Sequence, residues 1–191
     1  EDAESIFKRG SWDNLIILDA CRYDKYKEFR EHEVGKRYSL ASTSRQYVKR
    51  NFSEGDFSDI VYISANGFLT DYKLEKIVGE SDIFHAKFDT IENKWDEEKG
   101  TVLPEKVAED TLTAKKLFPD KKKIIHFVQP HQPYLTKDFS NYEKHYLSTE
   151  HRKILEVAER GQMSKEELIE AYEENLEEVE ENEEVENEDD E

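Results

Sequence analysis

The sequence contains a single cysteine, Cys21, so no internal disulfide can form. Such sparse cysteine usage is typical of proteins in a reducing compartment. No apolar run approaches the roughly 20 residues that a membrane-spanning helix needs. No stretch has the pattern of a secretory signal peptide. Together these absences predict a cytoplasmic protein without a membrane span.

Basic clusters are also scarce. The run Lys121–Lys123 precedes an apolar segment and is expected to be solvated, so nucleic acid is not an expected partner. The formal net charge is −18, from 46 acidic and 28 basic residues. Residues 173–191 hold 13 of the acidic residues and no basic ones, which leaves an ordinary excess of 5 acidic residues in 1–172. We therefore expect one domain over 1–172, followed over 173–191 by the acidic end of the last helix and a disordered low-complexity tail.

Apolar segments with a high content of β-branched residues alternate with segments of helical periodicity. Strands are predicted over 15–18, 59–64, 82–89 and 123–130. Helices are predicted over 22–32, 44–52, 104–118, 151–160 and 164–180, with a polar loop over 136–150. Pro104 suits the first turn of its helix, and Ser164 with Glu167 forms a capping-box pattern. This alternation predicts a layered α/β/α domain with a mostly parallel sheet.

In such sheets, ligands bind at the carboxyl ends of the strands. Asp19 ends the apolar run Leu15–Leu18, and a carboxylate at a rigid strand end can bind a divalent cation. The alternative is that Asp19 caps the helix that follows, a common role of aspartate. Arg22 and Asp24 could pair with each other or with Asp19.

A cluster of hydroxyl side chains precedes the helix predicted over 44–52. A hydroxyl at a helix N-terminus is well placed as a nucleophile, because the free N–H groups there attract an anionic group, although it still needs activation. Ser42 or Ser44 could instead cap the helix. Arg45 could bind an oxyanion.

Histidine occurs in and just after the last predicted strand. His126 lies inside the apolar segment and is expected to be a hydrogen-bonded core residue. His131 lies between Pro130 and Pro133, in a restricted loop that suits a substrate contact or a proton donor. Cys21 as a nucleophile is the weaker reading, since a small residue beside a buried strand usually packs.

Five segments of the sequence, taken together, resemble one known family. The chain contains, in this order, WDNLIILDACRYD, STSRQYVKRNF, VYISANG, WDEEKGTVLPE and IIHFVQPHQPY. This ordered set, which covers most of residues 11–176, resembles the archaeal-type sulfatase-like proteins of the alkaline phosphatase superfamily. The resemblance implies an alkaline phosphatase-like α/β fold and a metal-dependent hydrolase or transferase that acts on phosphate or sulfate esters of small molecules or glycans.

The resemblance also implies roles for particular residues. Asp19 matches the first metal-binding aspartate of the family, whose complete members are expected to hold Zn, Mn, Mg or Ca; this chain has too few of the ligands to hold such a metal tightly. Ser44 matches the nucleophile, with Thr43 and Ser42 as the nearest rivals. His131 matches the histidine expected near the ester group. The implied mechanism is in-line attack by a metal-activated Ser44 on phosphorus or sulfur.

The chain departs from the family pattern in several places. Ala20 stands where sulfatases carry a second acid, and the CxPSR motif is absent, which argues against a formylglycine sulfatase. The Asp-His-Gly element that supplies further metal ligands in the family is also absent, so we expect the chain to correspond to an N-terminal portion of a family member. The competing hypothesis is a truncated or degenerate, non-catalytic domain that binds an anion or a partner. We also expect an exposed sheet edge to promote self-association.

Overall fold

Four parallel strands form the centre of the fold, in the spatial order β1-β4-β2-β3. The computed structural model describes residues 5–8, 11–30, 34–136 and 164–188. The strands are β1 (Asn14–Asp19), β2 (Phe57–Ser64), β3 (Phe84–Asp89) and β4 (Lys122–Pro130). Each lies where the sequence predicts a strand. The layered α/β architecture is confirmed, and the described sheet is parallel throughout.

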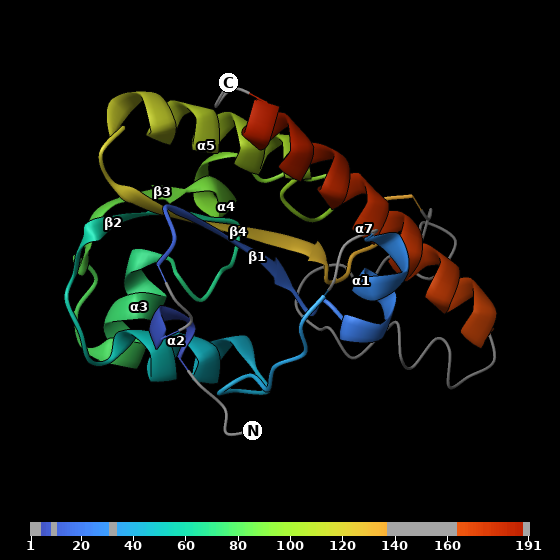
Figure 1. Cartoon of the computed structure of the whole chain (residues 1–191), viewed down its shortest axis with the longest axis horizontal. Coiled ribbons are helices and arrows are strands. Elements are labelled where there is room, and N and C mark those ends of the chain that lie inside the picture. Colours follow the sequence, from blue (N-terminus) through green and yellow to red (C-terminus); the bar gives the residue numbers. More distant parts are fainter. Residues whose placement is uncertain (1–4, 9–10, 31–33, 137–163, 189–191) are drawn as a thin grey trace.

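Helices cover both faces of this sheet (Figure 1). On one face lie α2 (Ser44–Phe52) and α3 (Asp71–Val78). On the other lie α5 (Pro104–Leu117) and α7 (Lys165–Glu188), which contact each other and β4. The shorter helices are η1 (Ile6–Lys8), α1 (Tyr23–Phe29) and α4 (Thr90–Asn93). Among the described residues, no helix is both long and apolar enough to cross a membrane.

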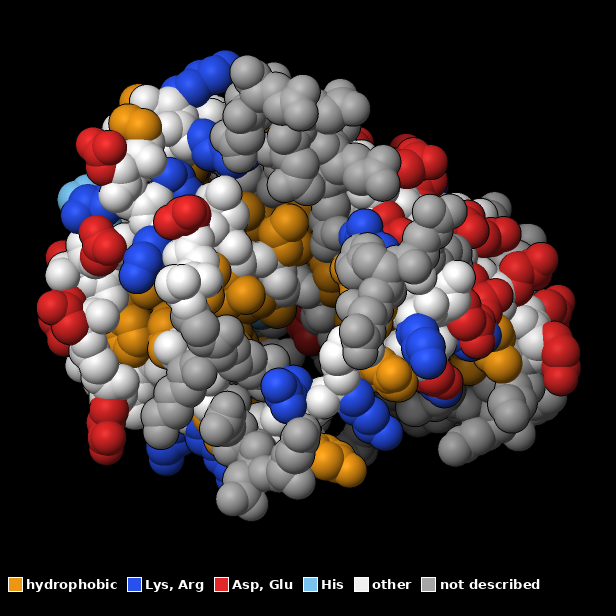
Figure 2. Space-filling view, in the orientation of Figure 1, with side chains coloured by type: hydrophobic (Ala, Val, Ile, Leu, Met, Phe, Trp, Pro, Cys, Tyr) orange, Lys and Arg blue, Asp and Glu red, His pale blue; other side chains and the backbone are white. Residues whose placement is uncertain are grey.

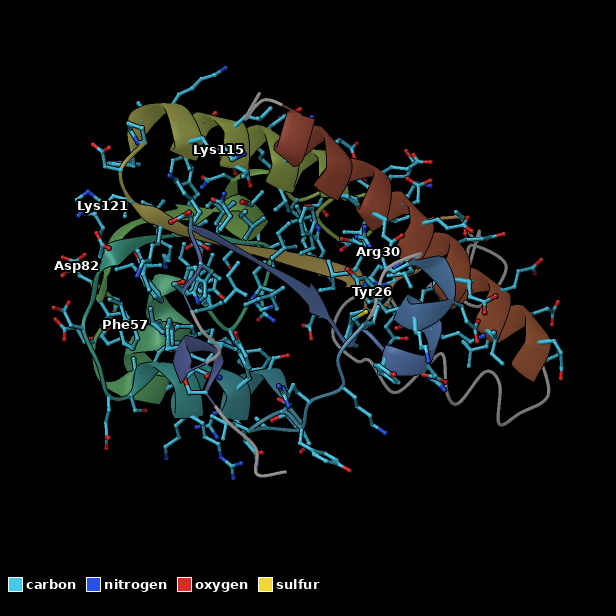
Figure 3. All side chains as sticks on the ribbon, viewed as in Figure 1. Tyr26, Arg30, Phe57, Asp82, Lys115 and Lys121 are labelled. Carbon is cyan, nitrogen blue, oxygen red and sulfur yellow. The ribbon has the colours of Figure 1, made fainter. Side chains whose placement is uncertain are left out.

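The central strand β4 is largely buried and apolar on both faces, because helices cover each face. In β4, Ile124 packs with the cluster under α2 and α3, whereas Ile125 and Phe127 pack with the cluster under α5 and α7. Alternate residues of a strand point to opposite faces, so an uninterrupted apolar run fills both cores. Phe57, labelled in Figure 3, belongs to the cluster on the α2/α3 side.

Local signals at the helix ends are confirmed. Pro104 occupies the first turn of α5. At the start of α7, the Ser164 N–H donates to the Glu167 carboxylate at 2.7 Å, and the Glu167 N–H donates to Ser164 Oγ at 3.1 Å. This reciprocal pair is the predicted capping box.

Other helix predictions differ from the structure. No helix is predicted for the segments that form α3 and α4. The last helix is predicted to end near residue 180 with a disordered tail, whereas α7 continues to Glu188; glutamate has a high helix propensity, which favours this extension. Figure 2 shows the acidic side chains of this helix gathered along one side of the molecule. The helix predicted over 151–160 and nearly all of the loop over 136–150 lie outside the described residues.

The outer strands of the described sheet are β1 and β3. Self-association through such an edge stays a prediction. Cys21, just after β1, is partly buried and packs against the core beneath α5 and α7, as its packing interpretation expects.

Candidate active site

Asp19 is the last residue of β1, at the carboxyl end of the sheet. The pairing register of β1 with β4 shifts between Leu18 and Asp19, and Ala20 then takes a left-handed conformation with φ 62°. This conformation is unfavourable for a residue with a Cβ, and it turns the chain sharply away from the sheet. Asp19 does not cap α1, because the N-cap position is Arg22. Arg22 pairs instead with Asp24, at 2.6 Å.

Ser44 is the first residue of α2, and its side chain faces Asp19. The Ser44 hydroxyl lies 3.3 Å from Asp19 Oδ2, to which it donates a hydrogen bond. The cap is supplied by Thr43, whose Oγ1 accepts from the Gln46 N–H at 3.4 Å. Capping is therefore the role of Thr43, and neither Ser42 nor Ser44 performs it. Of the three hydroxyl residues considered as nucleophiles, Ser44 is the one that lines the pocket described below.

Asn66, which was not among the predicted site residues, also contacts this carboxylate. It follows β2, is only 5% exposed, and its Nδ2 donates to Asp19 Oδ2 at 2.9 Å. Its Oδ1 accepts from the Phe68 N–H at 2.9 Å, so the amide orientation follows from both partners. The Asn66-Gly67 dipeptide signals a turn, but nothing in the local sequence indicates that the side chain reaches Asp19.

His131 lies just after β4, beside the same strand end. Its backbone N–H donates to the backbone carbonyl of Asp19 at 3.0 Å. Its Nδ1 lies 2.7 Å from the Gln132 carbonyl oxygen. A carbonyl can only accept, so Nδ1 carries the hydrogen of this bond. The contact therefore orients the imidazole ring and determines its tautomer.

These side chains share one pocket of about 230 Å³. Its polar lining consists of Asp19, Ser44, Asn66 and His131, together with Thr101 and Gln132. The remaining wall is largely apolar and includes Phe68, Ile91, Trp95, Val128 and Pro133. A mostly apolar pocket with a few converging polar groups is the usual form of a small-molecule site. Trp95 is 42% exposed and also lines a neighbouring hollow of about 340 Å³.

Arg45 has a different location. It lies on the first turn of α2, is exposed, and is not among the described residues that line the pocket. The sequence places it next to Ser44, but successive residues of a helix point in different directions, about 100° apart. Its proposed contact with an oxyanion therefore has no support from this geometry.

His126 belongs to the core, as predicted. It is 2% exposed, and its Nδ1 lies 2.9 Å from the Tyr62 hydroxyl, which is also fully buried. Burial lowers the pKa of His126, although the nearby Asp19 carboxylate acts in the opposite direction. Burial also raises the pKa of Tyr62 well above its usual value. Both groups are therefore neutral at physiological pH.

The donor set does not by itself fit a divalent metal. Among the described residues, no group of three or more histidine, cysteine, aspartate or glutamate side chains lies close enough to bind one ion. Asp19 supplies one carboxylate and Ser44 one hydroxyl, whereas Asn66 presents its N–H to Asp19 and its oxygen to Phe68. Divalent ions in proteins usually need several oxygen or nitrogen ligands.

Comparison of the chain with protein-family models, curated proteins and solved structures finds no match. The site is therefore interpreted from its own geometry.

Proposed function

We propose that this pocket binds a phosphate or sulfate ester and that Ser44 is the nucleophile for its hydrolysis or transfer. One observation carries the proposal. Asp19, Ser44 and His131, which were selected from distant segments of the sequence, line the same pocket. The parallel α/β sheet and the resemblance to archaeal-type sulfatase-like proteins of the alkaline phosphatase superfamily agree with it.

In the proposed reaction, Ser44 Oγ attacks the phosphorus or sulfur atom. A new Oγ–P or Oγ–S bond forms, the ester bond breaks, and the released alcohol takes up a proton. Asp19 orients the hydroxyl and can accept its proton. His131 Nε2, when protonated, can donate to the leaving oxygen. Water or an acceptor alcohol then releases the group from Ser44.

The pocket needs a group that offsets the negative charges of Asp19 and of the ester. The carboxylate of Asp19 repels an anionic ester, and N–H groups in the first turn of α2 offset this only in part. In complete family members, a divalent metal neutralises this charge and lowers the pKa of the nucleophile. Asp19 is the ligand that the described residues of this chain would contribute to such a metal.

The lack of further metal ligands among the described residues favours a second candidate function, a non-catalytic domain. The N–H groups at the start of α2 would then hold an anionic ligand, or the apolar wall of the pocket a partner segment, without turnover. Ser44 would then only position Asp19. The two functions differ in whether a covalent intermediate forms on Ser44.

The test uses p-nitrophenyl phosphate and p-nitrophenyl sulfate with Mg²⁺, Mn²⁺, Zn²⁺ or Ca²⁺. The expected result is turnover that Ser44→Ala abolishes and that Thr43→Ala, its neighbour at the helix cap, largely retains. Mass spectrometry of the quenched reaction should find the added phosphate or sulfate on Ser44. Turnover that survives in Ser44→Ala contradicts the proposal. Binding of inorganic phosphate without turnover supports the non-catalytic domain.

A further inference from the structure

Asn175 occupies an unusual position on α7. The inward stripe of this helix is otherwise apolar, with Ala171, Leu176 and Val179 buried. Asn175 is 0% exposed within that stripe. Burial of an amide costs free energy unless both of its polar atoms are hydrogen-bonded. A leucine would fill this buried position without that cost, so the reason for an amide here must lie in the hydrogen bonds that it makes.

Both polar atoms of Asn175 bind the loop that carries His131. Its Nδ2 donates to the His131 carbonyl at 3.3 Å, and its Oδ1 accepts from the Leu135 N–H at 3.1 Å. The amide thus holds the two ends of the segment from 131 to 135. This segment has little regular structure of its own to define its position.

Tyr172, one helical turn earlier, holds the turn after Asp19. Its hydroxyl donates to the Ala20 carbonyl at 3.2 Å and accepts from the Arg22 N–H at 2.8 Å. Burial raises the pKa of Tyr172, so the phenol keeps the proton that it donates. Residues three apart on a helix lie on the same side, so α7 presents Tyr172 and Asn175 together.

The two segments that α7 holds are also bonded to each other, because the His131 N–H donates to the Asp19 carbonyl at 3.0 Å. Ser44 and Asn66 reach the pocket from α2 and β2 instead. The distances from Ser44 to His131 and to Asp19 therefore depend on the position of α7 relative to the sheet. An ion pair just after α1 further stabilises its position: Arg30 Nε, beside Tyr26 in Figure 3, lies 3.3 Å from Glu180 Oε1.

We propose that Asn175 and Tyr172 are positioning residues of the pocket, through which α7 places His131 and Asp19 relative to Ser44. The inference rests on the proposed function for its kinetic consequences, but the positioning itself can be measured independently. A residue that only stabilises the fold would change global stability without a selective effect on the pocket.

The experiment compares Asn175→Leu, Asn175→Asp and Tyr172→Phe with the wild type. Asn182→Leu is the matched control, because the Asn182 amide donates to Glu178 O within α7 itself, at 2.8 Å. Native-state hydrogen exchange is followed by NMR at the amides of His131 and Leu135. We expect Asn175→Leu to speed exchange at Leu135 by about tenfold or more, as loss of one hydrogen bond predicts. Amides in β2 should be unaffected.

Asn175→Asp keeps an acceptor for the Leu135 N–H and loses the donor to His131, so it should restore most of the Leu135 protection. Tyr172→Phe removes both bonds to the turn after Asp19 and should speed exchange at Arg22. Unchanged exchange at Leu135 in Asn175→Leu, or at Arg22 in Tyr172→Phe, overturns the proposal. If Asn175→Leu does not fold, the other two variants decide it.

Kinetics with p-nitrophenyl phosphate or sulfate provide the second readout. Asn175→Leu should lower kcat by about tenfold or more while KM changes little, because misplacement of reacting groups impairs the chemical step more than binding. Asn182→Leu should match the wild type. A wild type without turnover contradicts the proposed hydrolysis alone, since the exchange rates still test the positioning. An unchanged kcat in an active Asn175→Leu overturns the positioning role.

Discussion

The side-chain amide of Asn66 lies 2.9 Å from Asp19 Oδ2 and joins the end of β1 to the turn after β2. These strands are not neighbours, because β4 lies between them. The hydrogen bond therefore crosses the carboxyl end of the sheet, the edge at which parallel α/β sheets bind ligands. Ser44 donates to the same oxygen from α2. The Asp19 carboxylate is thus held from two further elements before any ligand is bound.

Replacement of Asn66 by alanine should destabilise the protein. It removes the donor to Asp19 and leaves the partly buried Phe68 N–H without its acceptor. An unsatisfied buried group typically costs about 1–3 kcal/mol in the free energy of unfolding. Urea denaturation measures the loss. The control Asn93→Ala, at an exposed amide that donates to Asp89 O, should cost less; equal losses would argue against a special role for Asn66.

The free energy of unfolding should decrease as the pH is lowered, because of His126. Burial lowers its pKa below the ordinary value of 6.5, so the unfolded chain binds a proton at pH values where the folded protein does not. The free energy of unfolding should therefore be highest above that ordinary value and decrease as pH falls below it. Urea titrations from neutral to mildly acidic pH measure this slope.

The control for this pH effect uses two glutamine variants. His126→Gln keeps a hydrogen-bonding group near Tyr62 but removes the titration, so the slope should become shallower. His85→Gln, at an exposed histidine, should keep the wild-type slope. Identical slopes for the wild type and His126→Gln would show that the buried imidazole is not responsible.

Divalent metals should stabilise this chain only slightly. The described residues place one carboxylate, that of Asp19, in the pocket, and too few ligands give weak affinity. The melting temperature in Zn²⁺ or Mn²⁺ should therefore stay close to its value in chelator, because stabilisation depends on the ratio of metal concentration to Kd. A large metal-dependent increase that Asp19→Ala removes would reverse this conclusion.

Trp95 should contribute to binding of the organic group of an ester. Its ring lines the apolar side of the pocket and is 42% exposed, so a bound aryl group can pack against it. Under the proposed function, Trp95→Ala should raise KM for p-nitrophenyl phosphate by roughly three- to tenfold, for about 1 kcal/mol of lost contact. Tyr72→Ala, at an exposed aromatic on α3 outside the pocket, should leave KM unchanged; an equal effect of both would exclude a specific contact.

Much of the fold could be predicted from local patterns. The buried strands are readable as apolar runs because helices cover both faces of the sheet. The start of α5 at Pro104 and the capping box at Ser164 are readable because their partners lie within one helical turn. By contrast, α3 was not predicted although Leu74, Ile77 and Val78 have helical spacing and pack on the same core, because the helix is only eight residues long.

The residues of the site also differ in whether local patterns reveal them. Asp19, Ser44 and His131 could be selected from the sequence because each follows or begins a regular element, where side chains converge in a parallel sheet. Asn66 and Asn175 could not, since an asparagine after a strand or on an acidic helix is usually a turn or surface residue. The role of Arg45 stays a prediction, because closeness to Ser44 in sequence does not place it among the described residues that line the pocket.

Local patterns of residues are enough to predict the strands, most of the helices and the candidate residues at the strand ends, because periodicity and end signals depend on neighbours along the chain. Which of those residues come into contact depends on the tertiary structure. It brought Ser44 to Asp19 across 25 residues of sequence and Asn175 to the His131 loop across 44. These contacts depend on strand order and on how α2 and α7 pack, and no local pattern of residues encodes either.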